Sequence, residues 1–436
     1  MNTAAAYKGG ENFDLHKILL KGKKMNLKNK TEFFNGFINN LNENQEMLCM
    51  RCITTAADRE VEVFDINSNK TKKMLMFGSN NYLGFANHPY IKEKAKEAVE
   101  KFGTGIGGPP LLNGYTSLHR ELEQRLAALK GSEDCLIFSS GYGANVGLVT
   151  ALMNTDSLVL YDAFSHASFC DGIRMSAVQS FCFPHNNLSN LEQRLKNLRA
   201  KTAGDIYIGV EGVYSMDGDL APLDKIIALS RKYNAYLIVD DAHGTGVMGN
   251  KGRGTAEHFN MDGKIDLTMG TFSKTFAVTG GFAAGSKPVI NYLRFFARSY
   301  MFSASLPPVV IASVLAGLDV LENEPGLLES LKYNKKYTAD KLASLGFNCN
   351  SDTAIFPLIV PAGMNIRKAA NEFHKRGIFI NSIEYPAVPL SLQRFRVSIM
   401  ATHTKEDIDK LITAIEEVWD KNNYRIEESE NNLYAA

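Results

Sequence analysis

The sequence predicts an α/β protein with two parts: a large domain built on a mostly parallel, doubly wound sheet, and a small C-terminal α+β domain. Between residues 77 and 320, short apolar runs that end in glycine or polar residues alternate with helical patterns, as expected for parallel strands joined by helices. From about Leu321 the pattern changes to helix, strand, helix, strand, strand, helix. We therefore expect an N-terminal extension (1–75), a large domain (76–320) and a small domain (321–436).

Composition narrows the classes of partner. The 436 residues are 45% hydrophobic and 22% charged with a net charge of +1, which gives no electrostatic reason to expect nucleic acid. No apolar run reaches the roughly 20 residues of a spanning helix, and residues 1–20 lack the pattern of a signal peptide, so we expect a cytoplasmic protein. Cys49 and Cys52 form a C-x-x-C without a second pair, so no metal site is expected.

One amphipathic helix is expected in the N-terminal extension. Apolar residues recur there at helical spacing: Phe33, Phe34, Phe37, Ile38 and Leu41. The basic run at residues 21–24 is interpreted as a solvated face, with peripheral contact to a membrane surface or to an acidic carrier protein as the alternatives.

The first part of the large domain predicts a phosphate site. A strand ends near Phe77, and helices are expected over 88–102 and 118–129. The glycine-rich residues 103–110 follow a helix rather than a strand, so they are interpreted as a close-approach loop or a tight turn, not as a dinucleotide fingerprint. The strand 135–138 runs into Ser140, Gly141 and Tyr142, where the free amides of a starting helix suit a phosphate.

Polar residues also follow the next strands. His166 comes after the strand 157–162, where it could stack on a cofactor ring, bind a substrate carboxylate or face the core. A further strand begins at residue 206, and after a helix over 223–233 the strand from Tyr236 delivers Asp240 and His243. In open α/β sheets ligands bind at the carboxyl ends of the strands, where an Asp can pair with a protonated pyridine nitrogen. A helix cap would explain the Asp but not the His.

Residues 271–274 suggest the chemistry. Lys274 has apolar or small neighbours, and burial lowers the pKa of an amine and makes it a nucleophile toward carbonyls. Together with the hydroxyls of Thr271 and Ser273, which could hold a phosphate, this predicts a Schiff base to pyridoxal 5'-phosphate (PLP). The alternative is a surface lysine with satisfied hydrogen bonds. In the small domain we expect strands at 356–360 and 395–398 and helices at 366–376 and 405–419.

From residue 77 to residue 419 the chain resembles the α-oxoamine synthase family of fold-type I PLP enzymes. Five motifs in the expected order carry the resemblance: residues 79–84, 165–168, 240–243, 271–274 and 302–308. The resemblance implies that Lys274 binds PLP covalently and later acts as the base at the substrate α-carbon. It also implies that Asp240 pairs with the ring nitrogen, that His243 and Ser215 contact the ring oxygen, and that His166 stacks on the ring.

The resemblance implies further contacts. The phosphate would be held by Ser140, Gly141, Tyr142, Thr271 and Ser273. Ser303 would reach the phosphate of the neighbouring subunit, which implies a homodimer with shared active sites. Asn80 and Arg396 would hold the carboxylate of the amino acid, since a guanidinium binds carboxylate bidentately.

The implied reaction is a decarboxylative condensation of an amino acid with an acyl thioester, of coenzyme A or of an acyl carrier protein, to an α-amino ketone. The N-terminal extension and the apolar pair Leu111-Leu112 favour a lipid-forming, serine palmitoyltransferase-like enzyme. A cysteate acyltransferase for sulfonolipid synthesis, a 2-amino-3-ketobutyrate ligase and an 8-amino-7-oxononanoate synthase are the alternatives within the family. An aminotransferase, a lyase and a non-catalytic partner subunit are alternatives of other classes. Pro110 stands where most of the family has an arginine, so neither contacts to the acyl donor nor the amino-acid preference are carried over.

Overall fold

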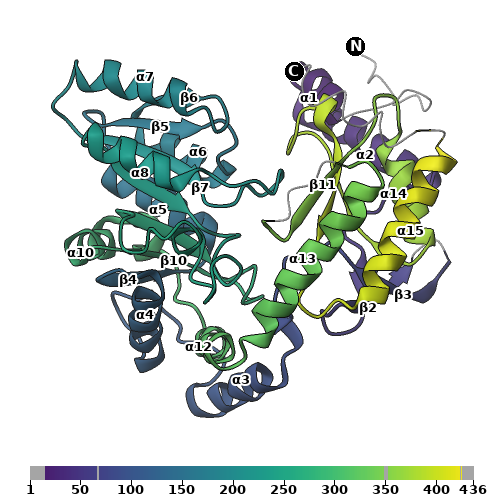
Figure 1. Ribbon diagram of the computed structural model, residues 1–436, viewed down its shortest axis with the longest axis horizontal. Helices are drawn as coiled ribbons and strands as arrows, with labels where there is room; N and C mark the ends of the chain where they lie inside the picture. The colour runs from purple at the N-terminus through teal and green to yellow at the C-terminus, as the bar shows by residue number, and fades with distance from the viewer. Residues whose placement is uncertain (1–14, 66–67, 348–351, 423, 425–436) are drawn as a thin grey trace.

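A seven-stranded sheet lies at the centre of the large domain in the computed structural model, which describes residues 15–65, 68–347, 352–422 and 424 (Figure 1). Its strand order is β4-β10-β9-β8-β7-β5-β6. The strands are β4 (Asp134–Phe138), β5 (Leu158–Asp162), β6 (Gln179–Phe183), β7 (Ile206–Glu211), β8 (Tyr236–Asp240), β9 (Leu267–Thr271) and β10 (Gly281–Gly285). Only β10 runs antiparallel to its neighbours in this sheet, so the predicted mostly parallel α/β fold is confirmed.

Helices cover both faces of this sheet because its apolar side chains alternate between them. Leu136 and Phe138 of β4 pack on one face with side chains of α5, α6 and α10, whereas Cys135 and Ile137 pack on the other with α4 and α12. Over β5, β7 and β8 that second face is covered by α7 and α8. The helical elements are η1 (Phe85–Asn87), α3 (Pro89–Phe102), α4 (Ser117–Lys130), α5 (Gly141–Leu152), α6 (Ala167–Ser176), α7 (Leu188–Arg199), α8 (Leu223–Lys232), α9 (Thr255–His258), α10 (Lys287–Phe296), α11 (Arg298–Met301) and α12 (Pro308–Asn323).

The C-terminal part follows the predicted order of elements except that three strands, rather than two, lie between its second helix and its last helix. It contains α13 (Gly326–Ser344), β11 (Ile355–Ile359), α14 (Ile366–Lys375), β12 (Ile378–Phe379), β13 (Asn381–Ile383), η2 (Leu390–Leu392), β14 (Arg394–Ser398) and α15 (Lys405–Lys421). The strands β11, β14 and β13 form an antiparallel sheet. Phe373, Phe395 and Trp419 stack edge to face beneath it, which joins α14 and α15 to the sheet.

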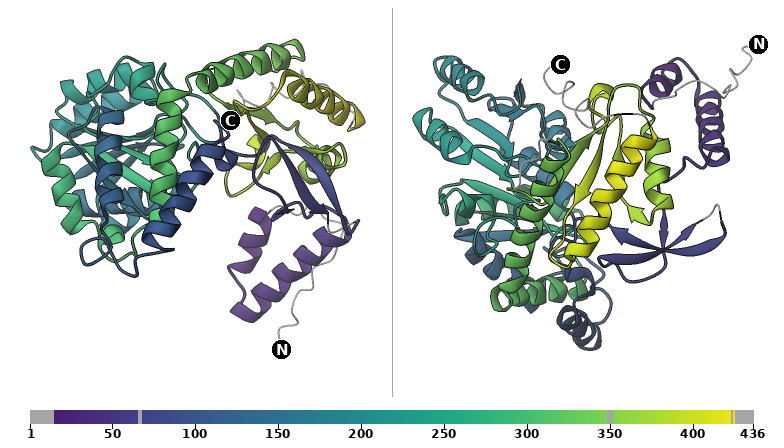
Figure 2. Two further views of the ribbon diagram at one scale, coloured as in Figure 1. Left: turned by 90° about the horizontal axis from the view of Figure 1, so that it is seen from below. Right: turned by 45° about the vertical axis from the view of Figure 1, so that its right-hand side comes forward.

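The N-terminal segment is joined to the C-terminal part by strand pairing. It contains α1 (Leu15–Gly22), α2 (Leu27–Glu43), β1 (Cys52–Ile53), β2 (Glu60–Asp65) and β3 (Lys70–Met76). β3 pairs in parallel with β12, with Leu75 opposite Ile378, so β1, β2, β3 and β12 make one sheet beside the small domain (Figure 2). The boundary expected at residue 320 falls within α12. Val320 and Leu321 are buried in the same apolar cluster as other residues of that helix.

The predicted amphipathic helix corresponds to α2. Phe33, Phe37 and Leu41 are buried, whereas Phe34 is exposed although its ring centroid lies 6.0 Å from that of Phe37. A second helix, α1, precedes it, and residues 1–14 of the expected extension lie outside the described residues. No helix in the described part of the chain is long and apolar enough to cross a membrane. Likewise, the described residues contain no group of three or more His, Cys, Asp or Glu side chains that could hold a metal ion.

Candidate active site

Four strands of the large sheet deliver the predicted site residues to one edge. β7, β8 and β9 are parallel neighbours, so Glu211 and Asp240 lie side by side at the ends of β7 and β8. β9 ends at Thr271, three residues before Lys274. β4 has the same direction, because β10 is antiparallel to both β4 and β9, and it leads into Ser140. The carboxyl ends of the strands therefore meet where the sequence predicts a ligand.

Asp240 is a buried carboxylate whose hydrogen bonds from the described residues come from an amide side chain and a backbone amide. Oδ2 accepts a hydrogen bond from Asn145 Nδ2 at 2.8 Å, and Oδ1 accepts one from the Ala242 amide at 3.1 Å. Both donors are uncharged, and burial raises the pKa of Asp240. A cation placed against this carboxylate would stabilise its ionised form, as a protonated ring nitrogen does.

His166 is connected to Asp240 by a chain of hydrogen bonds. Asn145 Nδ2 also donates to Ser168 Oγ at 2.9 Å, and Ser168 Oγ shares a hydrogen bond with His166 Nδ1 at 2.7 Å. The Ser168 amide donates to the same ring nitrogen at 3.2 Å, because His166 is the N-cap of α6. These hydrogen bonds fix one edge of the imidazole, while the residue itself is exposed. Stacking on a cofactor ring would require both a fixed ring orientation and an accessible ring face.

A second chain of hydrogen bonds runs from His243 to Arg396. His243 Nδ1 lies 2.7 Å from the Tyr82 hydroxyl, which donates to Asn80 Oδ1 at 3.2 Å, and Arg396 Nη2 donates to the same Asn80 oxygen at 3.0 Å. Burial lowers the pKa of His243, so its ring is neutral, and burial raises the pKa of Tyr82 to about 12. Arg396 is 5% exposed, and its Nε has no hydrogen-bond partner among the described residues. The buried guanidinium therefore has a donor available for an anion.

Lys274 combines with these groups to make a nucleophilic amine. Burial and the positive charge of Arg396 lower its pKa from 10.5 to about 8, although Asp240 and Glu211 act in the opposite direction. A substantial fraction of the amine is therefore neutral near physiological pH. Burial and the charge of Asp240 raise the pKa of Glu211, which favours its protonated form.

The N-terminus of α5 could hold a phosphate. Ser140 caps the helix by accepting a hydrogen bond from the Gly143 amide at 2.9 Å. A Cβ at Gly141 would lie only 2.9 Å from Thr271 Cβ, so glycine allows the helix to start against β9. Thr271 Oγ1 is 2.9 Å from Ser273 Oγ, which brings two hydroxyls beside the free amides of the helix. The side chain of Tyr142 is exposed and donates to Asp171 at 2.5 Å, which leaves its backbone amide as the group that could face a phosphate.

These residues fit PLP on their own chemistry. They supply a lysine with a lowered pKa, a buried carboxylate with uncharged donors, an exposed histidine ring and a helix N-terminus with two hydroxyls. Two predicted residues make other contacts. The Ser215 amide donates to Glu211 Oε2 at 3.2 Å, whereas Ser303 lines a small separate hollow together with Pro110 and Ser139.

Sequence reasoning missed four residues that hold the site together: Tyr82, Asn145, Ser168 and Glu211. Tyr82 and Ser168 lie inside motifs that were recognised, but their contacts are tertiary. Asn145 is one helical turn after Gly141, which was a usable signal for a side chain facing the same site. Glu211 was also recognisable as an acid that ends a buried strand next to the strand of Asp240.

Comparisons with known proteins show the family of the chain. The family model for aminotransferase class I and II matches residues 72–415. A serine palmitoyltransferase of Bacteriovorax stolpii is 42% identical over 80% of this chain and 83% of that protein. An 8-amino-7-oxononanoate synthase of Thermosipho melanesiensis is also 42% identical, over 80% of this chain and 89% of that protein.

Among solved structures, the serine palmitoyltransferase from S. paucimobilis with a bound PLP-myriocin aldimine matches with a TM-score of 0.86 at 30% identity. The match covers 92% of this chain and 100% of that one. The chain therefore belongs to the α-oxoamine synthase family of PLP-dependent, acyl-transferring enzymes, with the fold of type I.

Proposed function

We propose that this protein is a cytoplasmic, serine palmitoyltransferase-like enzyme that condenses L-serine with a long-chain acyl thioester and releases carbon dioxide. The observation that carries the proposal is the chain of hydrogen bonds from Arg396 through Asn80 and Tyr82 to His243, beside Lys274. It combines a buried carboxylate-binding group with an amine whose pKa is about 8. The related serine palmitoyltransferases support the choice of substrate.

In this proposal the cofactor would be held through its ring, its phosphate and one covalent bond. Asp240 would bind the ring nitrogen, His166 would stack on the ring, and His243 with Ser215 would contact the ring oxygen. The phosphate would lie at the N-terminus of α5, held by Ser140, Gly141, Tyr142, Thr271 and Ser273. Lys274 would hold the cofactor covalently through Nζ. When bound, PLP supplies the electron sink for the negative charge that develops at the α-carbon of the amino acid.

The protein residues then bind the amino acid and move its proton. Arg396 and Asn80 would hold the serine carboxylate. The serine amino group would take the place of Lys274 Nζ in the covalent bond to the cofactor, and the freed neutral amine of Lys274 would remove the proton from the α-carbon. A new carbon–carbon bond forms between the α-carbon and the acyl carbon, the carbon–sulfur bond breaks, and the thiolate leaves and takes up a proton. The bond from the α-carbon to the carboxylate breaks next, and Lys274 returns its proton to the α-carbon of the product. Arg396 orients the carboxylate throughout, and this orientation decides which bond breaks.

We propose further that the protein acts as a homodimer. Large apolar side chains are exposed near Ser303, with Leu112 81% and Phe302 72% exposed. Phe295 and Phe296 of α10 are also exposed. Large apolar side chains exposed in this way are candidates for a protein interface. A second copy that covers them would bring Ser303 to the phosphate of the neighbouring site.

An 8-amino-7-oxononanoate synthase is the second candidate, because such a relative has the same 42% identity. Titration of the purified holoenzyme with serine, alanine, glycine and cysteate, followed by cofactor absorbance, separates the candidates. We expect serine to change the spectrum at the lowest concentration and to turn over with palmitoyl-CoA. Preference for alanine with a pimeloyl thioester would establish the second candidate, and preference for cysteate a sulfonolipid enzyme.

The matched control is Lys274→Ala, which should retain the fold but lose covalent attachment of the cofactor and lose activity. Full activity of this variant would contradict the assignment of Lys274. Amino-group transfer to a keto acid without a thioester would instead indicate an aminotransferase.

A further inference from the structure

The helices α1 and α2 carry a concentration of positive charge that the active site does not use. Residues 15–34 contain six lysines and one glutamate, although the whole chain has a net charge of only +1, so the rest of the chain is net negative. All six lysines are exposed: Lys17, Lys21, Lys23, Lys24, Lys28 and Lys30. The charge is therefore segregated onto one small part of the surface.

The same two helices expose large apolar side chains between these lysines. Leu27 is 73% exposed, and Leu19, Leu20 and Phe34 are each more than two-fifths exposed. An apolar groove of about 940 Å³ also opens between the helices. Its lining includes Leu15, Ile18, Leu19, Phe34, Ile38, Lys23 and Lys30. Exposed leucines gain no free energy from contact with water, so a cluster of them indicates a surface that another molecule covers.

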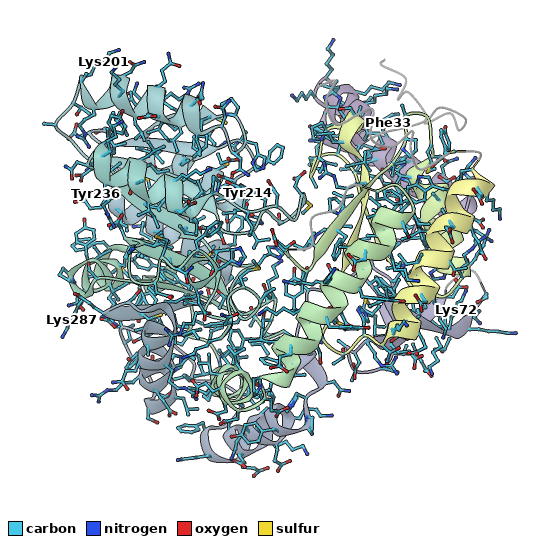
Figure 3. The ribbon with its side chains drawn as sticks, viewed as in Figure 1. Phe33, Lys72, Lys201, Tyr214, Tyr236 and Lys287 are labelled. Carbon is cyan, nitrogen blue, oxygen red and sulfur yellow. The ribbon has the colours of Figure 1, made fainter. Side chains whose placement is uncertain are left out.

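The helix pair is a fixed platform on the small-domain side of the molecule. Ile18, Phe33, Phe37 and Leu41 form its own buried cluster, and Phe33 is labelled there in Figure 3. The Arg367 guanidinium lies 5.1 Å from the centroid of the Phe37 ring, which attaches α2 to α14. Figure 2 shows α1 and α2 projecting from the edge of the molecule, away from the large domain.

We propose that α1 and α2 form a docking surface for an anionic lipid membrane. The lysines would meet the lipid phosphates, and Leu19, Leu20, Leu27 and Phe34 would enter the boundary between headgroups and acyl chains. Amphipathic helices with lysine on the polar side and leucine or phenylalanine on the other bind membranes in this way. An acidic carrier protein would account for the lysines but not for the exposed leucines. The surface is separate from the active site and does not rest on the proposed amino acid or acyl substrate.

The test is sedimentation of the full-length holoenzyme with lipid vesicles in the absence of substrates. We expect binding to vesicles of phosphatidylcholine with phosphatidylglycerol, weak binding to phosphatidylcholine alone, and weakening by salt. The triple change Lys23→Gln, Lys24→Gln, Lys30→Gln should weaken binding to the anionic vesicles by at least about tenfold. The double change Leu20→Ser, Leu27→Ser should weaken it as well, because the apolar contacts are lost.

A matched control is the triple change Lys92→Gln, Lys96→Gln, Lys101→Gln on the exposed side of α3, which should leave vesicle binding unchanged. Equal loss in this control would mean that only overall charge matters, and it would overturn the proposal. The proposal would be overturned in favour of a protein partner by two results together. The wild-type protein would not bind vesicles, and it would instead bind an acidic acyl carrier protein in a way that the lysine changes abolish. A change in oligomer mass caused by the leucine changes, again without vesicle binding, would indicate that a second copy covers the helices.

Discussion

Tyr82 connects the proposed substrate-binding residues to the proposed cofactor-binding residues through one hydroxyl. It lies between His243 and Asn80, and Asn80 in turn is held by Arg396. Tyr82→Phe removes the hydroxyl and leaves buried partners unsatisfied, so we expect kcat/KM for the amino acid to fall about tenfold while cofactor absorbance is retained. Steady-state kinetics measure this. Tyr207→Phe is the matched control because its hydroxyl bonds to the Leu152 carbonyl on the opposite side of the sheet from this network; an equal loss there would contradict the role of Tyr82.

His185 is a single residue that makes stability depend on pH. It lies between two carboxylates, with Nδ1 2.9 Å from Asp162 and Nε2 2.7 Å from Asp219, while its ring stacks on Phe164 and meets Tyr214 edge on. Burial opposes its charge, but the hydrogen bonds to the two aspartates outweigh burial and raise its pKa from 6.5 to about 9.

A histidine whose pKa is higher in the folded state gives stability that is complete below about pH 6.5 and disappears as pH rises through about 9. We therefore expect the free energy of unfolding to fall by on the order of 2–3 kcal/mol across this window. Urea denaturation at several pH values measures it. His185→Gln should flatten the profile, while His258→Gln on α9 should not; the same slope in wild type and His185→Gln would disprove the assignment.

At the scale of elements, the turn after β8 depends on a buried ion pair that comes from α4. Lys130, the last residue of that helix, donates to Asp241 Oδ2 at 2.7 Å, to Thr245 Oγ1 at 2.8 Å and to the Arg253 carbonyl at 2.5 Å. The other oxygen of Asp241 accepts from the amide and hydroxyl of Thr255. Asp240 directly precedes Asp241 in the chain and His243 lies two residues after it, so the ion pair fixes the turn that carries both.

Lys130→Met should destabilise the protein by about 3–5 kcal/mol, because it leaves a buried carboxylate without its cation. The double change Lys130→Met, Asp241→Leu should recover much of that stability without restoring cofactor affinity, since the turn stays unanchored. Urea denaturation and cofactor titration separate the two effects. Wild-type cofactor affinity in the double variant would show that the pair is structural only.

Helices and strands could be predicted where the local sequence pattern is sufficient to determine the secondary structure. The strands β4, β5, β7 and β8 are apolar runs with polar ends, and the sequence places them within one or two residues. β10 was not predicted, because its residues 281–285 are glycine, alanine and one phenylalanine, a composition without strand preference. Its position is set by packing, since a Cβ at Gly281 would lie 2.7 Å from the backbone of Gly141. Pairing of β3 with β12 joins residues about 300 apart, which no local pattern reveals.

At the scale of the whole molecule, some site residues could likewise be predicted from the sequence and others could not. Residues that follow strands of one parallel sheet could be predicted together, because the carboxyl ends of those strands must meet at one edge. Asn80 and Arg396 come from the two ends of the chain, and only the resemblance to a family brought them together before the structure did. Asn80 and Arg396 meet because β14 lies against the segment that follows β3. The Ser398 amide at the end of β14 donates a hydrogen bond to the Phe77 carbonyl in that segment.

Ser303 allows a test of whether two subunits share their active sites. If Ser303 reaches the phosphate of the partner, then Ser303→Asp inactivates the neighbouring site through charge repulsion, while Lys274→Ala inactivates its own. Mixing the two inactive proteins under conditions of subunit exchange should restore about a quarter of wild-type activity. Half of the dimers are then mixed, and each mixed dimer has one site with an intact lysine and an intact partner serine. Activity of the mixture and of each parent alone measures this. If Ser303 acted within its own chain, no mixed dimer would have a complete site, and the mixture would stay as inactive as its parents.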